Sequence, residues 1–562
     1  MEFECQESTT TFGKADNPYE EHVDLNPINC IISQQKSSVI AVTEKAKNLI
    51  AKLNGKSVHS SSSGSRDLVL VDDIENLSNL YLLSITDLPP SLISEILNCL
   101  EPKDLGVVSC VNTYLYKLAA DHTVWKEYYC ERWGQPLGGS PVLGPGGVPD
   151  VKSWKELFVE KEFRSRTFMG KYTLDSLFGH DEAVRTVFVL ASKKLVFTSG
   201  YDQTVRMWDM EKGISIASSR PLGCTIRAVA ADTRLLVVGG TDGFIHGWRA
   251  EEGNPHLFDI VAPQDEARQF RIWEHEGPIT CVALDFNRIY SGSWDMSIRI
   301  WDRASVRCLN VLMHNDWVWS LTPHDTTVAS TAGSDVYLWD AVQGVKIALM
   351  NGVHSGNSYS LARSHAGKLL FTGGEDGTIH MFEISANGGH CLQKVASWIP
   401  HTGPVYSLAF EFPWLVSASG DGRLSLIDVR KLLKTTRPSS IEKAPKFNRL
   451  DQTSIEPPQR MLHGFGSNLF SVDIGLDRIV CGGEEGVVRI WNFSEALEIE
   501  QRVRKLRGLR LENRMRRRRL QFDMTSKTAR GEQCTVVARK NQITGDGISW
   551  HNKRRVSGKL KA

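Results

Sequence analysis

Several kinds of feature are missing from this 562-residue sequence, and each absence removes a class of protein. The N-terminal MEFECQESTT has no basic and apolar leader, and no run of 18 apolar residues occurs, so we expect neither secretion nor a membrane partner. The 11 cysteines show no Cys-x-x-Cys pair and no Cys/His spacing typical of zinc, which predicts no metal and no disulfide framework. Nucleophile motifs and phosphate loops are also absent, so we expect no cofactor and no catalysis.

Net charge is almost absent from the whole chain but not from its parts. The sequence has 66 Lys and Arg against 65 Asp and Glu, a formal charge of +1. Residues 501–562 hold 19 basic and 4 acidic residues, a net charge of +15, whereas residues 1–500 hold 47 and 61, a net charge of −14. The C-terminal tail is therefore electrostatically distinct from the body of the chain.

A short motif is present seven times between residues 199 and 492. Each copy has a Gly- or Ser-rich pair, an acidic residue, a few alternating residues and then usually Trp. The last positions are spaced by 40, 53, 38, 43, 45 and 64 residues, which is typical of propeller blades with two loop insertions. These positions are Trp208, Trp248, Trp301, Trp339, Phe382, Ile427 and Trp491.

Each copy has the pattern of a β-hairpin. In SGYDQTVRMW a strand runs into a turn at Asp202, and a second strand alternates Val205 and Met207 with polar residues. Five copies are preceded by a histidine, namely His180, His275, His314, His354 and His401.

The copies resemble the WD40 repeat across residues 166–494. The resemblance implies a mainly β fold, a seven-bladed propeller. In each blade a His, a strand Ser or Thr, the turn Asp and the Trp would form a buried hydrogen-bonded set. Two copies fit this set fully, with His180, Ser199, Asp202 and Trp208 in one and His275, Ser291, Asp295 and Trp301 in the other.

The His and Asp pair also has a catalytic interpretation, because such pairs act in general acid–base chemistry. A pairing that recurs around a ring is better explained as a network that satisfies buried polar groups. We therefore assign these residues a structural role.

Residues 84–134 predict a small all-α domain ahead of the propeller. Pro89 and Pro90 suit a helix start, and apolar residues then recur at helical spacing in three short helices. Fewer than 55 residues cannot bury this much apolar surface alone. Part of it should face a partner.

This segment resembles an F-box, the module that docks onto the Skp1 adaptor of cullin-based ubiquitin ligases. The similarity rests on Leu88-Pro89, Ile96-Leu97 with Leu100, Pro102 to Leu105, Val108-Ser109 and Trp125. Val111 to Tyr114 depart from the Cys-Lys/Arg-x-Trp run of many F-boxes. An alternative is a helical cap that only packs on the propeller. The resemblance implies direct Skp1 contacts by Leu88, Pro89, Ile93, Ile96, Leu97, Leu100, Leu105 and Val108.

An F-box followed by a WD40 ring is the layout of the F-box/WD-repeat proteins. The resemblance implies the substrate-recognition subunit of a Skp1–cullin–F-box (SCF) ubiquitin ligase, which tethers a target protein near the ubiquitin-loaded enzyme. The rival is a WD-repeat scaffold of a nuclear ribonucleoprotein or chromatin complex, with the basic tail on nucleic acid.

Candidate binding residues lie where the repeats open onto one face of the propeller. Family members that read phosphorylated degrons place Arg there, because a guanidinium matches phosphate oxygens. We expect Arg185 and Arg227 to anchor an acidic or phosphorylated group of an unknown protein substrate. An apolar segment would lie on Trp294, Trp319, Tyr359 and Tyr406. The alternative is ordinary packing at the rim.

The basic tail predicts a partly helical segment with two arginine-rich clusters. Such runs serve nuclear import, nucleic-acid contact or solvation, and all three stay open. Phe522 and Trp550 are the only aromatics in the tail, which argues against a dedicated single-strand binder. We expect a protein of the nucleus, the cytoplasm or both. The import candidates are Arg514, Arg516, Arg517, Arg518, Arg519, Lys553, Arg554 and Arg555.

The predicted order of segments follows from these patterns. It runs from a largely disordered region (1–83) and the F-box (84–134) through a Gly/Pro-rich linker with a connecting helix (135–165) to the propeller (166–494) and the tail (495–562). The blade repeats end near residues 209, 249, 302, 340, 383, 428 and 492.

Overall fold

The structure is a computed structural model that describes residues 85, 88–120, 122–134, 153–251, 253–261, 268–385, 391–430, 432–433, 457, 459–462 and 466–529. The chain divides into two compact units, residues 1–87 and 88–562, and every element named below belongs to the second. The predictions for residues 1–83, for the Gly/Pro-rich stretch at 135–150 and for Lys553, Arg554 and Arg555 lie outside the described residues.

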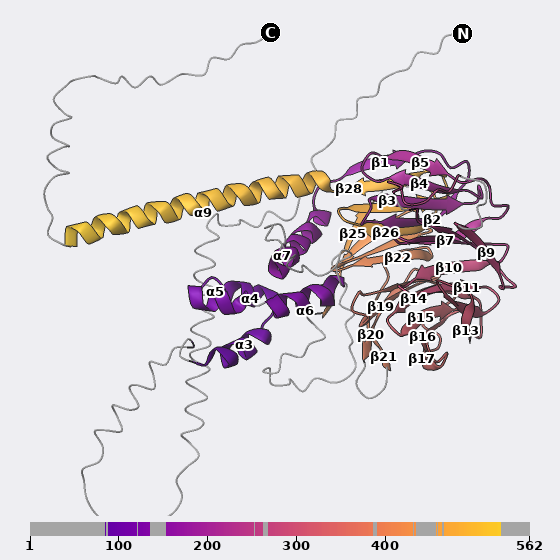
Figure 1. The fold of residues 1–562 in the computed structure, drawn as a ribbon, viewed down its shortest axis with the longest axis horizontal. Helices are drawn as coiled ribbons and strands as arrows, with labels where there is room; N and C mark the ends of the chain where they lie inside the picture. Colours follow the sequence, from indigo (N-terminus) through magenta and orange to yellow (C-terminus); the bar gives the residue numbers. More distant parts are fainter. Residues whose placement is uncertain are drawn as a thin grey trace, which may run out of the picture. The chain divides into compact units, whose positions relative to one another are not determined.

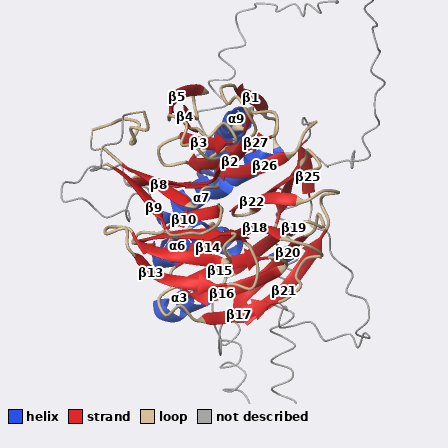
Figure 2. Ribbon diagram, turned by 90° about the vertical axis from the view of Figure 1, so that its right-hand side faces the viewer, coloured by secondary structure: helices blue, strands red, loops and turns tan. Residues whose placement is uncertain are grey.

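Seven antiparallel four-stranded sheets make up most of the described structure (Figure 2). The first comprises β2 (Val184–Leu190), β3 (Leu195–Gly200), β4 (Val205–Asp209) and β5 (Ile214–Ser218). The second comprises β6 (Ile226–Ala231), β7 (Leu235–Gly240), β8 (Phe244–Arg249) and β9 (Gln269–Trp273). The third comprises β10 (Ile279–Leu284), β11 (Arg288–Ser293), β12 (Ser297–Asp302) and β13 (Cys308–Met313).

The remaining sheets follow the same plan. The fourth comprises β14 (Val318–His324), β15 (Thr327–Ala332), β16 (Asp335–Asp340) and β17 (Lys346–Met350). The fifth comprises β18 (Ser358–Arg363), β19 (Leu369–Gly374), β20 (Ile379–Ser385) and β21 (Cys391–Trp398). The sixth comprises β22 (Val405–Glu411), β23 (Trp414–Ser419), β24 (Leu424–Asp428) and β25 (Gln459–Leu462). The seventh comprises β26 (Leu469–Gly475), β27 (Arg478–Gly483), β28 (Val488–Asn492) and β1 (Thr173–Leu177).

The sheets close into a ring, which confirms the predicted seven-bladed propeller (Figure 1). The first strand of each blade contacts the first strands of the two neighbouring blades, and β26 contacts β2. The last blade takes its outer strand from ahead of the first blade, since β1 pairs with β28 from Thr173↔Asn492 to Leu177↔Val488. This shared blade fastens the two ends of the propeller to each other.

Short helices precede the propeller. They begin where proline or a capping side chain starts them: Pro90 and Pro102 occupy first-turn positions, and the Asn112 side chain accepts a hydrogen bond from Leu115 N at 2.7 Å. The sequence predicted three helices up to Trp125, and the structure has a fourth that contains this Trp. The helices are α3 (Pro90–Asn98), α4 (Pro102–Val108), α5 (Thr113–Ala119), α6 (His122–Trp133), α7 (Trp154–Ser165) and the 3₁₀ turn η2 (Arg166–Met169).

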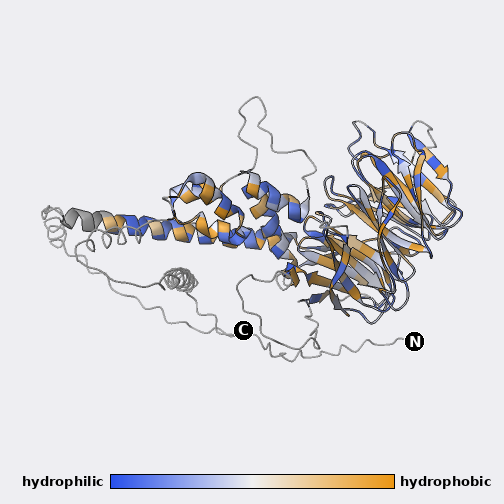
Figure 3. Cartoon of the chain, turned by 90° about the horizontal axis from the view of Figure 1, so that it is seen from below, coloured by the Kyte–Doolittle hydropathy of each residue, from blue (hydrophilic) through white to orange (hydrophobic). Residues whose placement is uncertain are grey.

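A long helix, α9 (Ser494–Ala529), follows the last blade. Much of it has the blue colour of hydrophilic residues in Figure 3, in keeping with its many arginines. Among the described helices, none combines the length and the apolar character needed to cross a membrane.

Candidate functional site

Blade 3 contains the predicted hydrogen-bonded set in full. His275 Nδ1 lies 2.7 Å from Asp295 Oδ2, and His275 Nε2 lies 2.7 Å from Ser291 Oγ, which accepts from Trp301 Nε1 at 3.0 Å. Burial alone would raise the pKa of Asp295, but hydrogen bonds from His275 and Ser297 outweigh it and lower the pKa to about 2. The ionised Asp therefore accepts a hydrogen bond from His275 Nδ1–H and orients the ring, so that Nε2 meets the Ser291 hydroxyl.

Blade 1 contains the same network with a different hydroxyl, and the assignment of Ser199 is wrong. His180 Nε2 lies 2.7 Å from Thr198 Oγ1, which accepts from Trp208 Nε1 at 2.8 Å. Ser199 Oγ is buried without a hydrogen-bond partner, because neighbouring residues of a strand point to opposite faces. Counting four residues back from the turn Asp identifies Thr198 here and Ser291 in blade 3.

Blades 5 and 6 also keep the buried imidazole network, although Phe382 and Ile427 replace Trp. His354 lies 3.1 Å from Asp376 and 2.8 Å from Thr372. In blade 6 the corresponding distances are 3.1 Å from His401 to Asp421 and 2.8 Å to Ser417. Because each imidazole uses both nitrogens within its blade, the repetition supports a structural role over a catalytic one.

Five of the six predicted binding residues, all except Trp294, share an unusual backbone position. In every innermost strand the pairing register skips one residue near the start of the strand, which marks a β-bulge. A bulge redirects the side chain of the extra residue, and the same position recurs in all seven blades. The skipped residues are Arg185, Arg227, Thr280, Trp319, Tyr359, Tyr406 and Phe470.

Six of these residues, together with Trp294, form what we call the arginine–aromatic ring. The aromatic side chains lie next to one another, and the distances between their centroids are 5.6 Å (Trp294–Trp319), 4.8 Å (Trp319–Tyr359), 5.5 Å (Tyr359–Tyr406) and 5.7 Å (Tyr406–Phe470). The remaining bulged residue, Thr280 of blade 3, is not part of this ring, since its Oγ1 donates a hydrogen bond to Val318 O at 2.7 Å. Trp294, from the hairpin turn of the same blade, contributes the ring member there.

Two arginines complete the ring without an acidic partner. The guanidinium of Arg185 lies 5.0 Å from the centroid of Phe470, and that of Arg227 lies 4.5 Å from the centroid of Trp294. Burial lowers the pKa of Arg185, and burial with the positive charge of Arg185 lowers the pKa of Arg227 to about 10. No Asp or Glu of the described ranges forms an ion pair with either arginine. An arginine side chain stays protonated in proteins, so an incoming anion would find positive charge that no described carboxylate offsets.

Two acidic side chains stand at the hairpin position that Trp294 has in blade 3, and each is held by an asparagine and not by an arginine. Glu375 Oε2 accepts hydrogen bonds from the backbone N and the side-chain Nδ2 of Asn357, at 3.0 and 3.1 Å. Glu484 Oε2 accepts from Asn468 Nδ2 at 3.1 Å. The arginines therefore keep their charge available.

One aromatic neighbour of the ring was missed by the sequence reasoning. Trp317 is 45% exposed and stacks on Trp294, with centroids 5.1 Å apart and planes at 27°. It lies two residues ahead of the bulged Trp319 and is not at the turn position of Trp294, so the two repeat positions that predicted those residues pass over it. The alternation Trp-Val-Trp at 317–319 was the available signal.

The eight predicted adaptor contacts divide into two groups. Ile93, Leu97 and Leu105 are at most 4% exposed and lie in the core of the helical domain with Trp125 and Phe158. In this structure these three contact their own domain, which corrects their assignment to a direct interface. Leu100 and Val108 are partly buried against the same core.

A second apolar stripe of α3 and its start faces outward. Leu88, Leu92 and Ile96 follow one another at four-residue steps, and they are 40%, 45% and 43% exposed. Pro89 is exposed as well. Helix α3 is thus apolar on two sides, of which only one is covered by the part of the chain that the structure describes.

Contacts link the helices to blade 6. Trp133 Nε1 donates to Phe412 O at 2.8 Å, and Lys161 Nζ lies 2.7 Å from Glu411 Oε1. Trp414 Nε1 donates to the carbonyl of Ser165 at the end of α7. Two indole donors and a partly buried ion pair therefore satisfy backbone carbonyls and charges along this junction.

The first basic cluster of the tail lies on α9. Its side chains are exposed, and they are Arg514, Arg516, Arg517, Arg518 and Arg519. Nearer the propeller, the guanidinium of Arg504 lies 5.3 Å from the ring of Phe163 in α7. The arginine block is thus free to meet a partner, while the start of the helix is held by α7.

The family patterns that match this chain identify the same blades as the hydrogen-bonded networks do. The F-box-like pattern matches residues 85–131. The pattern "WD domain, G-beta repeat" matches residues 171–209, 268–302, 351–383 and 392–428. The last three segments hold blades 3, 5 and 6, the first holds blade 1, and these four are the blades with a complete His, Asp and hydroxyl network.

Full-length similarity is also found. The chain is 57% identical over 566 residues to "F-box/WD-40 repeat-containing protein At5g21040" of Arabidopsis thaliana, covering 100% of both chains. It is 22% identical over 352 residues to "F-box/WD repeat-containing protein 9" of Homo sapiens, covering 60% of this chain and 72% of that one. Among solved structures, the WD40 β-propeller domain of Doa1 matches with a TM-score of 0.46 and 19% identity, covering 57% of this chain and 97% of that one.

Proposed function

Because this chain belongs to the F-box/WD-40 repeat-containing proteins, we propose that it is the substrate-recognition subunit of an SCF-type ubiquitin ligase. The helical domain would dock a Skp1-type adaptor and, through it, a cullin. The propeller would hold a target protein, whose lysines would then meet the ubiquitin-loaded enzyme at high effective concentration. The chain would act without bond chemistry of its own.

The observation that carries this proposal is the outward stripe of Leu88, Leu92 and Ile96. An exposed apolar face on a helix whose other face is fully packed favours a permanent protein partner. The stripe lies within the F-box-like segment, which makes a Skp1-type adaptor the partner of choice.

Co-purification with a Skp1-type adaptor tests the proposal. Leu92→Asp/Ile96→Asp places two charges in the outward stripe and leaves the core residues untouched, and we expect adaptor affinity to fall roughly 100-fold or more. Glu95→Gln is the matched control, since Glu95 is an exposed residue of the same helix, and it should retain the adaptor. Equal retention by the double variant and the control would refute the ligase function.

The arginine–aromatic ring is the surface we propose for the target protein. An acidic or phosphorylated group would bind Arg185 and Arg227, and an apolar or aromatic segment would lie along Trp294, Trp319, Tyr359 and Tyr406. Unsatisfied cationic charge beside a run of partly buried aromatics supports this pairing.

We also propose that the exposed arginine block of α9 is a nuclear import signal. Replacement of Arg514 and Arg516 to Arg519 by Gln keeps helix-forming residues but removes the charge, and imaging should then show a loss of nuclear protein. An unaltered nuclear fraction would contradict import. Salt-sensitive RNA binding that requires residues 501–562, without adaptor retention, would instead favour the scaffold function.

A further inference from the structure

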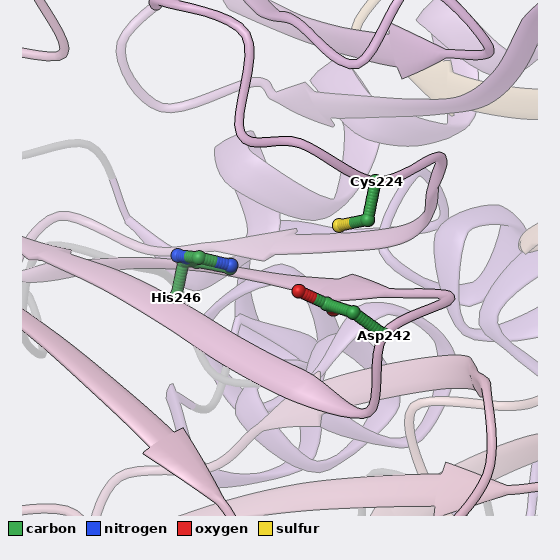
Figure 4. A group of neighbouring side chains, drawn as sticks. All are labelled: Cys224, Asp242 and His246. Atoms are coloured by element: carbon green, nitrogen blue, oxygen red, sulfur yellow. The ribbon is translucent and has the colours of Figure 1, made fainter.

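Blade 2 contains a cluster of side chains that the proposed ligase function does not use. Cys224 precedes β6, Asp242 lies in the turn between β7 and β8, and His246 lies in β8 (Figure 4). The cysteine sulfur, a carboxylate oxygen and an imidazole nitrogen all lie within 4.8 Å of one another. Figure 4 shows the three side chains converging from these separate segments.

The cluster stands where other blades have their hydrogen-bonded network. Four residues ahead of the turn acid, blade 2 has Val238 instead of a Ser or Thr. The histidine that begins blades 1, 3, 5 and 6 is missing too. Asp242 therefore lacks its usual imidazole partner, and Cys224 and His246 approach it instead.

His246 has an unused nitrogen inside this cluster. The residue is 7% exposed, and its Nε2 atom is buried without a hydrogen-bond partner. In Figure 4 a ring nitrogen of His246 faces the carboxylate of Asp242 and the sulfur of Cys224. A buried imidazole nitrogen without a partner is unfavourable, and a ligand between the three side chains would satisfy it.

The surrounding residues hold the cluster together. A Cβ atom on Gly240 would lie 2.4 Å from Cys224 Sγ and 2.5 Å from Asp242 Oδ1, so only glycine lets the thiol and the carboxylate approach. Asp242 Oδ1 accepts from Phe244 N at 3.1 Å, and Oδ2 accepts from Arg271 at 3.2 Å. Carboxylates that bind metals are commonly oriented by such second hydrogen bonds.

We propose that Cys224, Asp242 and His246 bind a zinc ion, with water as a fourth ligand. Sulfur, nitrogen and oxygen donors together suit tetrahedral Zn²⁺, whereas Ca²⁺ and Mg²⁺ prefer oxygen alone. The ion would replace the missing hydrogen-bonded network and join the entry of β6 to the β7–β8 hairpin. Its role would be structural, because metal binding adds to folding stability.

Cobalt substitution tests the site directly in the full chain bound to its adaptor. One equivalent of Co²⁺ should produce a thiolate-to-metal charge-transfer band in the wild type, and Cys224→Ser should abolish it. Cys481→Ser is the matched control, because Cys481 is another buried propeller thiol outside the cluster. It should keep the band.

A second variant guards against a simple folding defect. His246→Gln should weaken zinc binding at least about tenfold, while the far-ultraviolet circular dichroism stays that of the wild type. Zinc should also raise the thermal midpoint of the wild type and of Cys481→Ser, but not of Cys224→Ser. Absence of a thiolate band in the wild type, or its persistence in Cys224→Ser, would overturn the proposal and leave the cluster as a thiol–carboxylate hydrogen bond.

Discussion

The networks inside the blades and the arginine–aromatic ring come from the same short stretches of chain, yet they use their polar groups in opposite ways. His275 has both ring nitrogens occupied, by Asp295 and Ser291. Arg185 and Arg227 meet aromatic faces and no described carboxylate. A set of polar groups that satisfies itself can stabilise a fold, whereas a set left unsatisfied has interactions to offer a ligand.

This contrast predicts that the network controls stability and leaves binding intact. His275→Ala would leave Asp295 and Ser291 without the imidazole that joins them in a buried site, and we expect a loss of about 3 kcal/mol in the free energy of unfolding. Urea denaturation measures it. His256→Ala, at an exposed histidine, should change stability by less than about 0.5 kcal/mol. A similarly small effect for His275→Ala would remove the structural assignment.

The ring should show the reverse behaviour. Arg185→Ala/Arg227→Ala removes both cations, and we expect roughly 100-fold weaker binding of an acidic or phosphorylated target, because hydrogen bonds to charged groups are each worth about 1.5–3 kcal/mol. Stability should not fall, since two neighbouring like charges are removed. Binding of targets captured by the adaptor-deficient Leu92→Asp/Ile96→Asp chain provides the measurement.

Two controls define the chemistry of that site. Phosphatase treatment of the target distinguishes a phosphate from a carboxylate as the anchored group. Glu375→Gln/Glu484→Gln removes negative charge from the same face and should tighten binding of an acidic target a few-fold. Unchanged target binding by the double arginine variant would mean that the ring is ordinary rim packing.

Lowering the pH should also reduce the stability of the blades while the arginines of the arginine–aromatic ring keep their charge. Burial lowers the pKa of His314 to about 4, and burial with the charge of His354 lowers that of His380 to about 4. The unfolded chain takes up protons near pH 6.5, so stability falls as pH drops from about 6.5 to about 4. The contribution of Asp295 and Asp376, whose folded pKa is about 2, is complete above about pH 3.9 and is lost toward pH 2.

Urea midpoints at pH 7, 5.5 and 4.5 measure this dependence. His314→Gln should reduce the slope of stability against pH by about one proton in that window. The ring would keep its charge throughout, since the pKa of Arg227 is about 10. Stability that stays constant from pH 7 to pH 4.5 would contradict the buried, neutral state of these histidines.

Repetition decided how much of the fold the sequence could predict. Seven spaced motifs were enough for the propeller, because each hairpin repeats the same turn and the same buried aromatic. Strand β1 was not anticipated, since closure of the seventh blade depends on pairing between Thr173 and Asn492 across the whole ring. Long-range pairing of this kind leaves no local pattern.

The candidate site was predictable at residues whose position in the repeat determines the direction of their side chains. Arg185, Arg227, Trp319, Tyr359 and Tyr406 all lie at bulges, which the repeat alignment locates without knowledge of the backbone. Burial was not predictable to the same degree. In α3 the helical period groups the apolar residues but does not say which side packs inward. The sequence does not reveal the cluster of Cys224, Asp242 and His246, because these three residues meet only after β6, β7 and β8 fold together.

Blade 1 provides the smallest test of the contrast between satisfied and unsatisfied polar groups, since the neighbouring hydroxyls of Thr198 and Ser199 lie on opposite sides of one strand. Thr198→Val keeps the shape but removes the hydroxyl that joins His180 to Trp208, and we expect a loss of about 1–2 kcal/mol because two buried groups lose a partner. Ser199→Ala removes a hydroxyl that has no partner, and it should be neutral or slightly stabilising. Denaturant unfolding of both variants side by side measures the difference. A larger loss of stability for Ser199→Ala than for Thr198→Val would mean that Ser199 belongs to the network after all. The expected order would instead show that the network hydroxyl is the one four residues before the turn Asp.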